Sequence, residues 1–247
     1  MQSIDRAMNI IHILLSKSPE NKLSISELAN ETDLPISTLH RILRAMMKHR
    51  LIEQDPRTKF YGIGSIWLEY GLLIYDTIDY VSQTRPELEK LMKTLDESVY
   101  LYKPMGNESL IIERIDSSSG AIRVYDKIGS RISMHIGASN HVMLAFMEQR
   151  EMEKIVGSLI APSEQEKFIN YLNRIREKGY ALSENELTEG TTSVAAPVTN
   201  HHGEVQGAVG IRFVNFNLTE DRTDFLIKNV CLAAKEISIK FGNQRLE

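Results

Sequence analysis

Short polar and basic side chains recur at helical spacing between residues 36 and 49. They fall on one stripe of a helix or at its edges, and they are Ser37, Thr38, His40, Arg41, Arg44 and Lys48. Arginine can bind guanine edges through two hydrogen bonds, while serine, threonine and lysine can hold phosphates. The sequence has no acidic residue from Leu34 to Ile52. This pattern is typical of a helix that enters the major groove of DNA, and the alternative is a solvated cationic face on an ordinary helix.

The flanking residues predict the elements that would hold this helix in place. Ser24 and Glu27 have the spacing of a capping box, so a short helix should begin there. A turn follows at residues 33–35, because Pro35 disfavours a helical conformation for the residue before it. After the second helix, residues 51–62 have the pattern of strand, turn and strand. Two basic residues lie at the tip, as in the wing of a winged helix-turn-helix, and these are Arg57 and Lys59.

Charge is distributed unevenly along the 247 residues. The net charge of −4 argues weakly against a protein that coats nucleic acid through bulk charge. Residues 1–64 nevertheless carry nine Lys and Arg against seven Asp and Glu, so a basic excess falls on the predicted helix-turn-helix. A small DNA-facing module attached to an acidic body fits this asymmetry.

Cysteine content and hydropathy exclude several classes of protein. The single cysteine, Cys231, rules out an internal disulfide and a multi-cysteine metal site, and its apolar helical setting predicts a buried, unreactive thiol. We find no signal peptide, and the apolar stretch 66–78 is too short, and interrupted by Glu69, to span a bilayer. We therefore expect a cytoplasmic protein that does not associate with membranes. We expect no metal site, since the adjacent His201 and His202 suit an exposed hairpin turn.

Hydrophobic periodicity predicts two helices around the DNA-binding module. The helix at 3–16 has a wide apolar stripe, which suggests burial against the helix-turn-helix and against a second subunit; a single deep core contact is the alternative. The helix at 66–79 is apolar nearly all round, as a linker packed across a dimer interface would be. The expected domains are a winged helix-turn-helix at 1–64, a linker helix at 65–83 and a second domain at 84–247.

The second domain alternates strands and helices in an order that predicts an α+β fold. It should open near Thr84, with Pro86 in the first turn of a helix. Strand-like runs occur at 99–103, 110–115, 121–127, 180–183, 193–198 and 205–213. We expect a loop at 129–139 and helices near 142–146, 163–178 and 220–241. The helix at 163–178 should start with a capping box at Ser163 and stop at Gly179. This arrangement favours a largely antiparallel sheet.

Three stretches of this domain could line a ligand site. Residues 135–140 precede a helix, so their backbone N–H groups could bind an anion with help from the helix dipole; an ordinary capped helix start is the alternative. Small residues fill 193–197, which leaves room for a ligand or for a tightly packed helix. Strand alternation places Arg212 beside Ala208 and Gly210, where its guanidinium could bind a carboxylate ligand. The alternative is a salt bridge to a neighbouring acidic residue.

The chain resembles the IclR family of bacterial transcription regulators over essentially its whole length. The stretches that carry the resemblance are SIDRA at 3–7, PISTLHRIL at 35–43, HIGAS at 135–139, KGYA at 178–181 and EGTTSVAAPV at 189–198. Their number and order make the signal much more specific than the helix-turn-helix alone. The resemblance implies an N-terminal winged helix-turn-helix, a linker helix and a C-terminal GAF-like domain that binds a small metabolite.

The resemblance also implies partners and site residues. Members of the family are usually dimers or dimers of dimers on palindromic operators, and their effectors are often organic acids, sugar acids or aromatic carboxylates. Together with the loop at 135–140, it implies an effector site at Gly137, Ala138, Ser139, Asn140, Ser183, Ser193, Gly210 and Arg212. Asn140, Ser183 and Ser193 depart from the common pattern, in which glycine, an acidic residue and cysteine occur. The identity of the effector therefore stays open.

These observations favour a DNA-binding regulator, and specifically a repressor of a catabolic operon that responds to a small carboxylate and needs no cofactor. One alternative is a constitutive regulator whose second domain only oligomerises. Another is a hydrolase that uses Ser139 and His135. Against the hydrolase stands the sequence itself, which has no G-x-S-x-G elbow, Walker loop, H-E-x-x-H or C-x-x-C motif. We therefore expect no catalytic residues.

Overall fold

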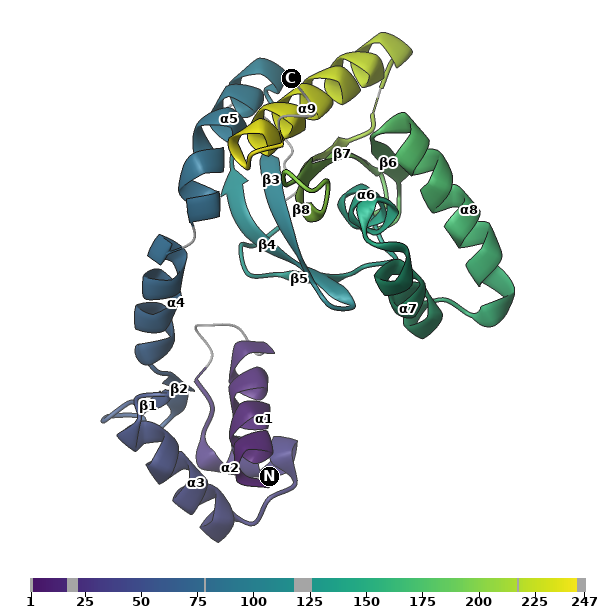
Figure 1. The fold of residues 1–247 in the computed structure, drawn as a ribbon. Helices are drawn as coiled ribbons and strands as arrows, with labels where there is room; N and C mark the ends of the chain where they lie inside the picture. The colour runs from purple at the N-terminus through teal and green to yellow at the C-terminus, as the bar shows by residue number, and fades with distance from the viewer. Residues whose placement is uncertain (1, 17–21, 78, 118–125, 217, 244–247) are drawn as a thin grey trace. The chain divides into compact units, whose positions relative to one another are not determined.

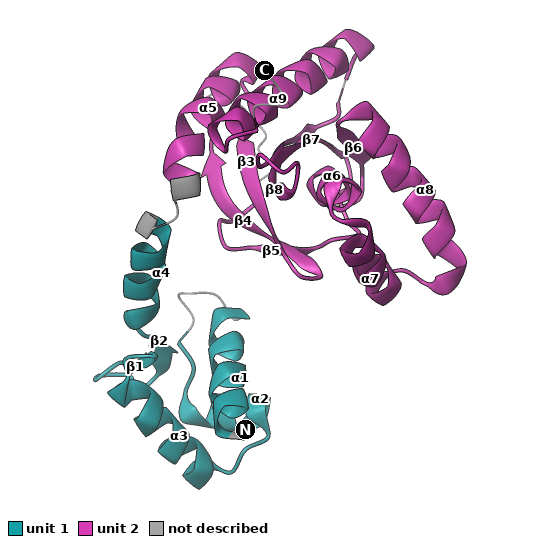
Figure 2. Cartoon of the chain, viewed as in Figure 1, with its two compact units in different colours: residues 1–78 teal, residues 79–247 magenta. Residues whose placement is uncertain are grey.

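The computed structural model describes residues 2–16, 22–77, 79–117, 126–216 and 218–243. The chain divides into two compact units, 1–78 and 79–247 (Figure 2), and each has its own hydrophobic core. The predicted linker at 65–83 thus covers the last helix of the first unit and the start of the second unit. No helix in the described part of the chain is long and apolar enough to cross a membrane.

The first unit consists of helices around a small hairpin (Figure 1). In order along the chain its elements are α1 (Gln2–Ser16), α2 (Ile25–Thr32), α3 (Ile36–Lys48), β1 (Ile52–Gln54), β2 (Tyr61–Ile63) and α4 (Ile66–Thr77). Its core collects aliphatic side chains from successive elements, among them Ile10, Leu28, Leu39, Leu43 and Ile52. The apolar stripes of α1 and α3 therefore face one another across this core, as their helical spacing predicts.

The second unit is an antiparallel sheet between helices. Its strands are β3 (Val99–Met105), β4 (Glu108–Ile115), β5 (Arg131–Ser133), β6 (Ala181–Glu184), β7 (Thr191–Thr199) and β8 (Val205–Val214). Their order across the sheet is β5-β4-β3-β8-β7-β6, and each neighbouring pair is antiparallel. This confirms the predicted α+β class and the antiparallel sheet. The sheet places β8, which carries Arg212, near its centre.

Helices cover both faces of that sheet (Figure 1). Helices α5 (Asp79–Leu95) and α9 (Glu220–Lys240) lie on one face, and α6 (Ala138–Phe146) lies on the other, flanked by α7 (Gln149–Leu159) and α8 (Pro162–Lys178). Residues directly opposite one another on paired strands share a face of the sheet. Ser193 of β7 is opposite Arg212 of β8, and Ala195 is opposite Gly210, so these four residues face the α6 layer.

Several predicted elements differ from the observed ones. The predicted loop at 129–139 contains the short edge strand β5, and α7 was not predicted. Pro86 lies inside α5 rather than in its first turn, because the helix begins at Asp79. Helix α8 begins at Pro162 with Ala161 as its N-cap, so the predicted capping box at Ser163 does not form. The strand predicted at 121–127 falls mostly outside the described residues.

Candidate functional site

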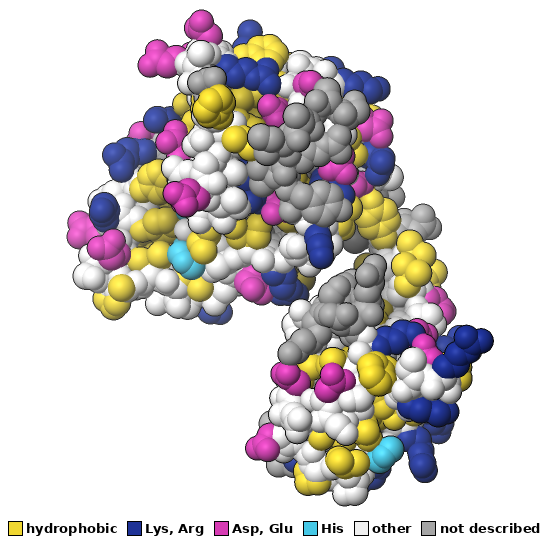
Figure 3. Space-filling view, turned by 180° about the vertical axis from the view of Figure 1, so that it is seen from behind, with side chains coloured by type: hydrophobic (Ala, Val, Ile, Leu, Met, Phe, Trp, Pro, Cys, Tyr) yellow, Lys and Arg dark blue, Asp and Glu magenta, His cyan; other side chains and the backbone are white. Residues whose placement is uncertain are grey.

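Helix α3 presents the predicted stripe of polar and basic residues to solvent. Leu39, Leu43 and Met46 bury the opposite side of the helix in the core. Ser37, His40, Arg41, Arg44 and Lys48 are exposed, and Thr38 is half-buried at the edge. On the face drawn in Figure 3, Lys and Arg side chains gather along one side of this unit. The helix can therefore present a row of hydrogen-bond donors to a polyanion while its buried side stays packed in the core.

Local hydrogen bonds fix the start of α2 and the turn before α3. The Ser24 hydroxyl accepts the Glu27 N–H at 3.2 Å, and the Glu27 carboxylate accepts the Ser24 N–H at 2.7 Å, which confirms the predicted capping box. Helix α2 ends at Thr32, and its C-cap residue Asp33 has a left-handed φ of 53°. Pro35 then serves as the N-cap of α3 and accepts the Thr38 N–H through its carbonyl at 2.9 Å. The left-handed Asp33 and the Pro35 cap thus define the turn between α2 and α3.

The hairpin after α3 is organised by Asp55. Its Oδ1 accepts the N–H groups of Arg57 at 2.9 Å and Thr58 at 3.1 Å, and its Oδ2 accepts a hydrogen bond from Lys22 at 3.2 Å. The backbone hydrogen bonds, with the Lys22 ammonium, lower the pKa of Asp55 to about 2. Arg57 and Lys59 are both exposed at the tip. Asp55 was not among the predicted site residues, although an Asp-Pro pair at the start of a turn is a recognisable signal.

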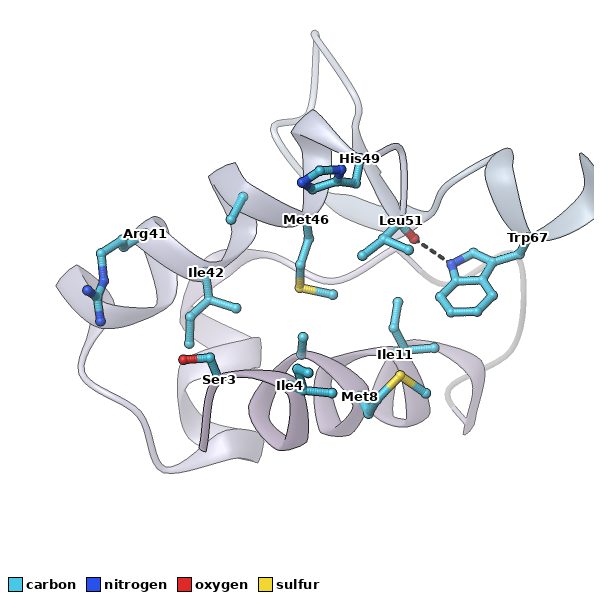
Figure 4. A pocket seen from close by; sticks show the side chains of 12 residues that line it. Ser3, Ile4, Met8, Ile11, Arg41, Ile42, Met46, His49, Leu51 and Trp67 are labelled. Atoms are coloured by element: carbon cyan, nitrogen blue, oxygen red, sulfur yellow. Dashed lines mark hydrogen bonds between the residues drawn. The ribbon is translucent and has the colours of Figure 1, made fainter. Parts of the chain in front are cut away.

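An apolar groove runs between α1 and α3 (Figure 4). It has a volume of about 450 Å³, and its lining includes Ile4, Met8, Ile42, Met46 and Trp67. The Trp67 indole donates a hydrogen bond to the Leu51 carbonyl at 2.8 Å, which joins the start of α4 to the hairpin. Ile4 is 73% exposed, so the outer side of α1 is uncovered in the single chain.

In the second unit the predicted effector residues converge on one small cavity. The cavity has a volume of about 10 Å³, and six of the predicted residues line it, namely Gly137, Ala138, Ser139, Asn140, Ser193 and Arg212. Gly210 and Ser183 do not line the cavity, but they adjoin Ser139 and Ser193 of its lining. A Cβ at Gly210 would lie 2.5 Å from the Ser139 Oγ, and the Ser193 hydroxyl is 3.5 Å from the Ser183 carbonyl oxygen. Residues up to 75 positions apart in the sequence thus meet at the N-terminus of α6.

Arg212 is buried and already faces a carboxylate of its own chain. Its side chain is 4% exposed, and its guanidinium forms an ion pair with Asp126, whose side chain is 20% exposed. The N-terminus of α6 is also paired internally. The Gly137 N–H donates to the Glu186 carboxylate at 2.6 Å, and the Ala138 N–H lies 3.5 Å from the Ser193 hydroxyl. Both predicted anion-binding groups therefore hold acidic residues of the same chain.

The cavity has further lining residues that were not among the predicted site residues. They are Tyr102, Ile132, Ile136 and Leu187, and Asp126, which was also missed, contacts Arg212. Burial raises the pKa of Tyr102 to about 12, so its phenol stays protonated at physiological pH. Within the described residues, Arg212 Nε and Asn140 Oδ1 are buried and make no hydrogen bond. Strand alternation puts Tyr102 on the same face of β3 as Tyr100 but does not identify that face as the one toward the cavity, and no local pattern identifies Asp126.

His135 and Ser139 are not arranged as a nucleophile and base. His135 Nδ1 lies 2.9 Å from the Ser133 hydroxyl, while Ser139 packs against Gly210 on the sheet. The neighbouring His141 is buried, which lowers its pKa and favours the neutral imidazole. Its Nε2 lies 2.9 Å from the His135 carbonyl oxygen and donates to it. The geometry favours a binding site over a hydrolytic one.

Comparison with known proteins extends this description. Residues 3–56 match the family model described as the IclR helix-turn-helix domain, and residues 74–239 match the one described as the bacterial transcriptional regulator IclR C-terminal domain. The chain is 28% identical to the HTH-type transcriptional regulator KipR of Bacillus subtilis over 98% of this chain and 97% of that one.

Solved structures show the same fold. An IclR transcriptional regulator from Alicyclobacillus acidocaldarius aligns with a TM-score of 0.80 at 20% identity, covering 98% of this chain and 99% of that chain. An IclR homologue from Microbacterium hydrocarbonoxydans, crystallised with 4-hydroxybenzoate, aligns with a TM-score of 0.80 at 18% identity, covering 97% and 99%.

Proposed function

Since the chain belongs to the IclR family of bacterial transcriptional regulators, we propose that it is a repressor whose affinity for a palindromic operator is controlled by a small carboxylate. The acid binds in the second unit, in the cavity beside Arg212. The observation that carries this proposal is a buried arginine, 4% exposed, among the small and hydroxyl-bearing residues of that cavity. A guanidinium in such a place suits a carboxylate, with which it can form two parallel hydrogen bonds.

The DNA contact is assigned to α3 and the hairpin. The exposed polar and basic residues of α3 enter the major groove, and Arg57 and Lys59 at the hairpin tip contact the backbone beside it. Support comes from the match to a helix-turn-helix family model, from the capping box of Ser24 and Glu27 that starts α2, and from Pro35 at the N-cap of α3. Because these polar and basic side chains are exposed, each of them can contact the bases or the phosphates.

The working form is a homodimer, or a dimer of such dimers. Helix α4 exposes apolar side chains around its whole circumference, including Leu68 at 67%, Leu72 at 59% and Leu73 at 60%. Single-chain proteins rarely leave so much contiguous apolar surface in water. A second copy of the chain is the fitting occupant, because a two-fold axis would also place two α3 helices on the half-sites of a palindrome.

The relative crystallised with 4-hydroxybenzoate supports a carboxylate as the class of ligand for this fold. In the proposed mechanism the acid binds the two arrangements of the dimer unequally and so shifts the spacing of the α3 helices. A coupling free energy of about 1–3 kcal/mol is enough to change operator occupancy substantially.

Fluorescence anisotropy of the full chain tests both halves of the proposal. The DNA is taken from upstream of the protein's own gene and compared with a scrambled duplex, at two salt concentrations and with a panel of carboxylic acids. We expect sequence-dependent binding that at least one acid weakens, and an Arg212→Gln variant that binds the DNA normally but ignores the acid. Equal binding to both duplexes would contradict operator recognition. An undiminished acid response in Arg212→Gln would contradict the assigned site.

A further inference from the structure

Arg212 has a charge partner before any ligand arrives, and this partner comes from outside the strands and helices. Asp126 lies in the connection that leads from β4 to β5. Its carboxylate contacts the guanidinium of Arg212, which is buried on β8. A buried arginine without a counter-charge would be strongly destabilising, so the free protein needs this carboxylate or an equivalent one.

The backbone of Asp126 is held independently of its side chain. Its carbonyl accepts a hydrogen bond from the Arg114 guanidinium of β4 at 2.7 Å. Arg114 in turn forms an ion pair with Asp116 at 2.9 Å. Nearby, the Gly129 N–H donates to the Ile111 carbonyl at 2.8 Å. Rotation about the side-chain bonds of Asp126 is therefore enough to free Arg212, and the backbone can stay where it is.

The two sides of the ion pair differ in their surroundings. The Asp126 side chain is 20% exposed, whereas the Arg212 side chain is 4% exposed. A displaced Asp126 carboxylate can therefore turn toward water, but Arg212 cannot follow it. Arg212 Nε and Asn140 Oδ1 lack hydrogen bonds within the described residues, and both residues line the cavity. The site thus offers polar groups that Asp126 does not satisfy.

We propose that Asp126 is a tethered competitor of the effector: its carboxylate occupies the place on Arg212 that the effector's carboxylate takes, and binding exchanges one for the other. This inference rests on the proposed function, and it specifies how that site is regulated. The apparent dissociation constant of the acid equals its intrinsic value divided by the fraction of molecules in which Arg212 is free. Neutral analogues are rejected, because they would leave Arg212 buried without a counter-charge.

Chemical rescue of an Asp126→Ala variant tests the exchange without knowledge of the natural effector. The probes are formate and acetate, with acetamide as the neutral control, and the readout is the melting temperature of the full chain at constant ionic strength. The variant should melt below the wild type, and formate or acetate should raise its melting temperature with an apparent affinity at least about ten-fold tighter than for the wild type. Acetamide should have no such effect.

Three further variants make the test specific to the pair. Asp126→Asn, which removes the charge but fills the space, serves in place of Asp126→Ala should that variant fail to fold, and it should also bind acetate more tightly than the wild type does. Asp126→Glu keeps a carboxylate within reach of Arg212 and should resist acetate as the wild type does. The double variant Asp126→Ala/Arg212→Gln should lose the response to carboxylates.

The exchange is overturned if the charge-removing variants bind acetate no more tightly than the wild type, or if the gain survives in the double variant. DNA anisotropy separates this failure from that of the proposed function. If an acid releases the wild type from its operator but Asp126→Ala binds acetate no more tightly than the wild type, only the exchange is contradicted. If formate rescues Asp126→Ala in a way that needs Arg212, but no acid changes DNA binding, the exchange is supported and the effector-controlled repressor is contradicted.

Discussion

Ser139 in the first turn of α6 packs so closely on Gly210 of β8 that a methyl group at position 210 would lie 2.5 Å from the Ser139 Oγ. Tyr102 and Ala195 would lie 3.3 and 3.4 Å from the same methyl group. The helix and the sheet therefore meet at a residue without a side chain, at the back of the cavity. Any carbon atom added there must push α6 outward or turn the Ser139 hydroxyl away.

Replacing Gly210 by Ala should destabilise the second unit by about 1–3 kcal/mol, the usual range for overpacking a tight core. Urea denaturation followed by circular dichroism would measure the change. Adding Ser139→Gly should recover part of the loss, because it removes the hydroxyl that the new methyl group meets. Gly157→Ala on α7 is the matched control: a Cβ there has no neighbour within 4 Å, so that variant should be at least as stable as the wild type. Equal stability of the two alanine variants would contradict the prediction.

Arg44→Ala should weaken operator binding by about 1–3 kcal/mol, because Arg44 is exposed on α3 where a guanidinium can reach base edges. Anisotropy titrations with the operator and with a scrambled duplex would show a larger loss on the operator. Arg176→Ala removes an exposed arginine from α8 in the second unit and serves as the charge control. A loss of the same size on both duplexes would assign Arg44 to the phosphates instead.

Asp55 should be needed for DNA binding even though it is acidic. Asp55→Ala removes the acceptor of the Arg57 and Thr58 N–H groups and should weaken binding several-fold by loosening the hairpin tip. Asp55→Asn keeps an oxygen acceptor and loses only the ion pair with Lys22, so it should bind almost as the wild type does. If the alanine variant binds DNA more tightly, the side chain acts mainly as a repelling charge.

The pKa of Asp55 gives a matching pH test. Its folded-state value of about 2 lies below the ordinary value of 3.8. The stabilisation from the charged form is therefore present above the ordinary value of 3.8, and it is lost as the pH falls from there through about 2. Amide exchange at Arg57 and Thr58 should show an intact turn throughout pH 5–8, apart from the intrinsic pH dependence of exchange. The assignment would be contradicted if the wild type lost protection between pH 5 and 8 and the Asp55→Asn variant did not.

Leu72→Glu on α4 should dissociate the dimer and lower operator affinity, since Leu72 is 59% exposed in the single chain and becomes buried between copies in the proposed dimer. Sedimentation equilibrium would give the mass of the particle. Phe216→Glu is the control, because Phe216 is 83% exposed in the second unit and lies outside the proposed interface. A dimer that persists in Leu72→Glu would place the contact between copies elsewhere.

Local sequence patterns accounted for the parts of the fold that local energies decide. The Ser24–Glu27 capping box forms because both side chains satisfy N–H groups within one turn. Strand alternation on β8 correctly put Arg212 and Gly210 on one face. At α8 two local signals competed, and Pro162 at the first helical position prevailed over the Ser163 pattern. Pro86 stays helical inside α5, which packs against α9 and the sheet.

The contacts that define the cavity could not be predicted in this way. Asp126 meets Arg212 across 86 positions of sequence, and Glu186 meets Gly137 across 49. Each pairing depends on the order of strands in the sheet, and neither leaves a periodic pattern in the chain. Edge strand β5 was missed for a related reason, because three residues are too few to show an alternation.

The size of the space beside Arg212 bears on how quickly the protein can answer a change in its surroundings. A cavity of about 10 Å³ holds at most one water molecule, so an acid cannot enter by collision alone. Opening must come first, and its rate then limits association. At high acid concentrations the association rate observed by stopped-flow would level off at the rate of opening. Such rearrangements take between microseconds and seconds. The packing around Arg212 would thus determine the delay between the appearance of an acid and the release of the promoter.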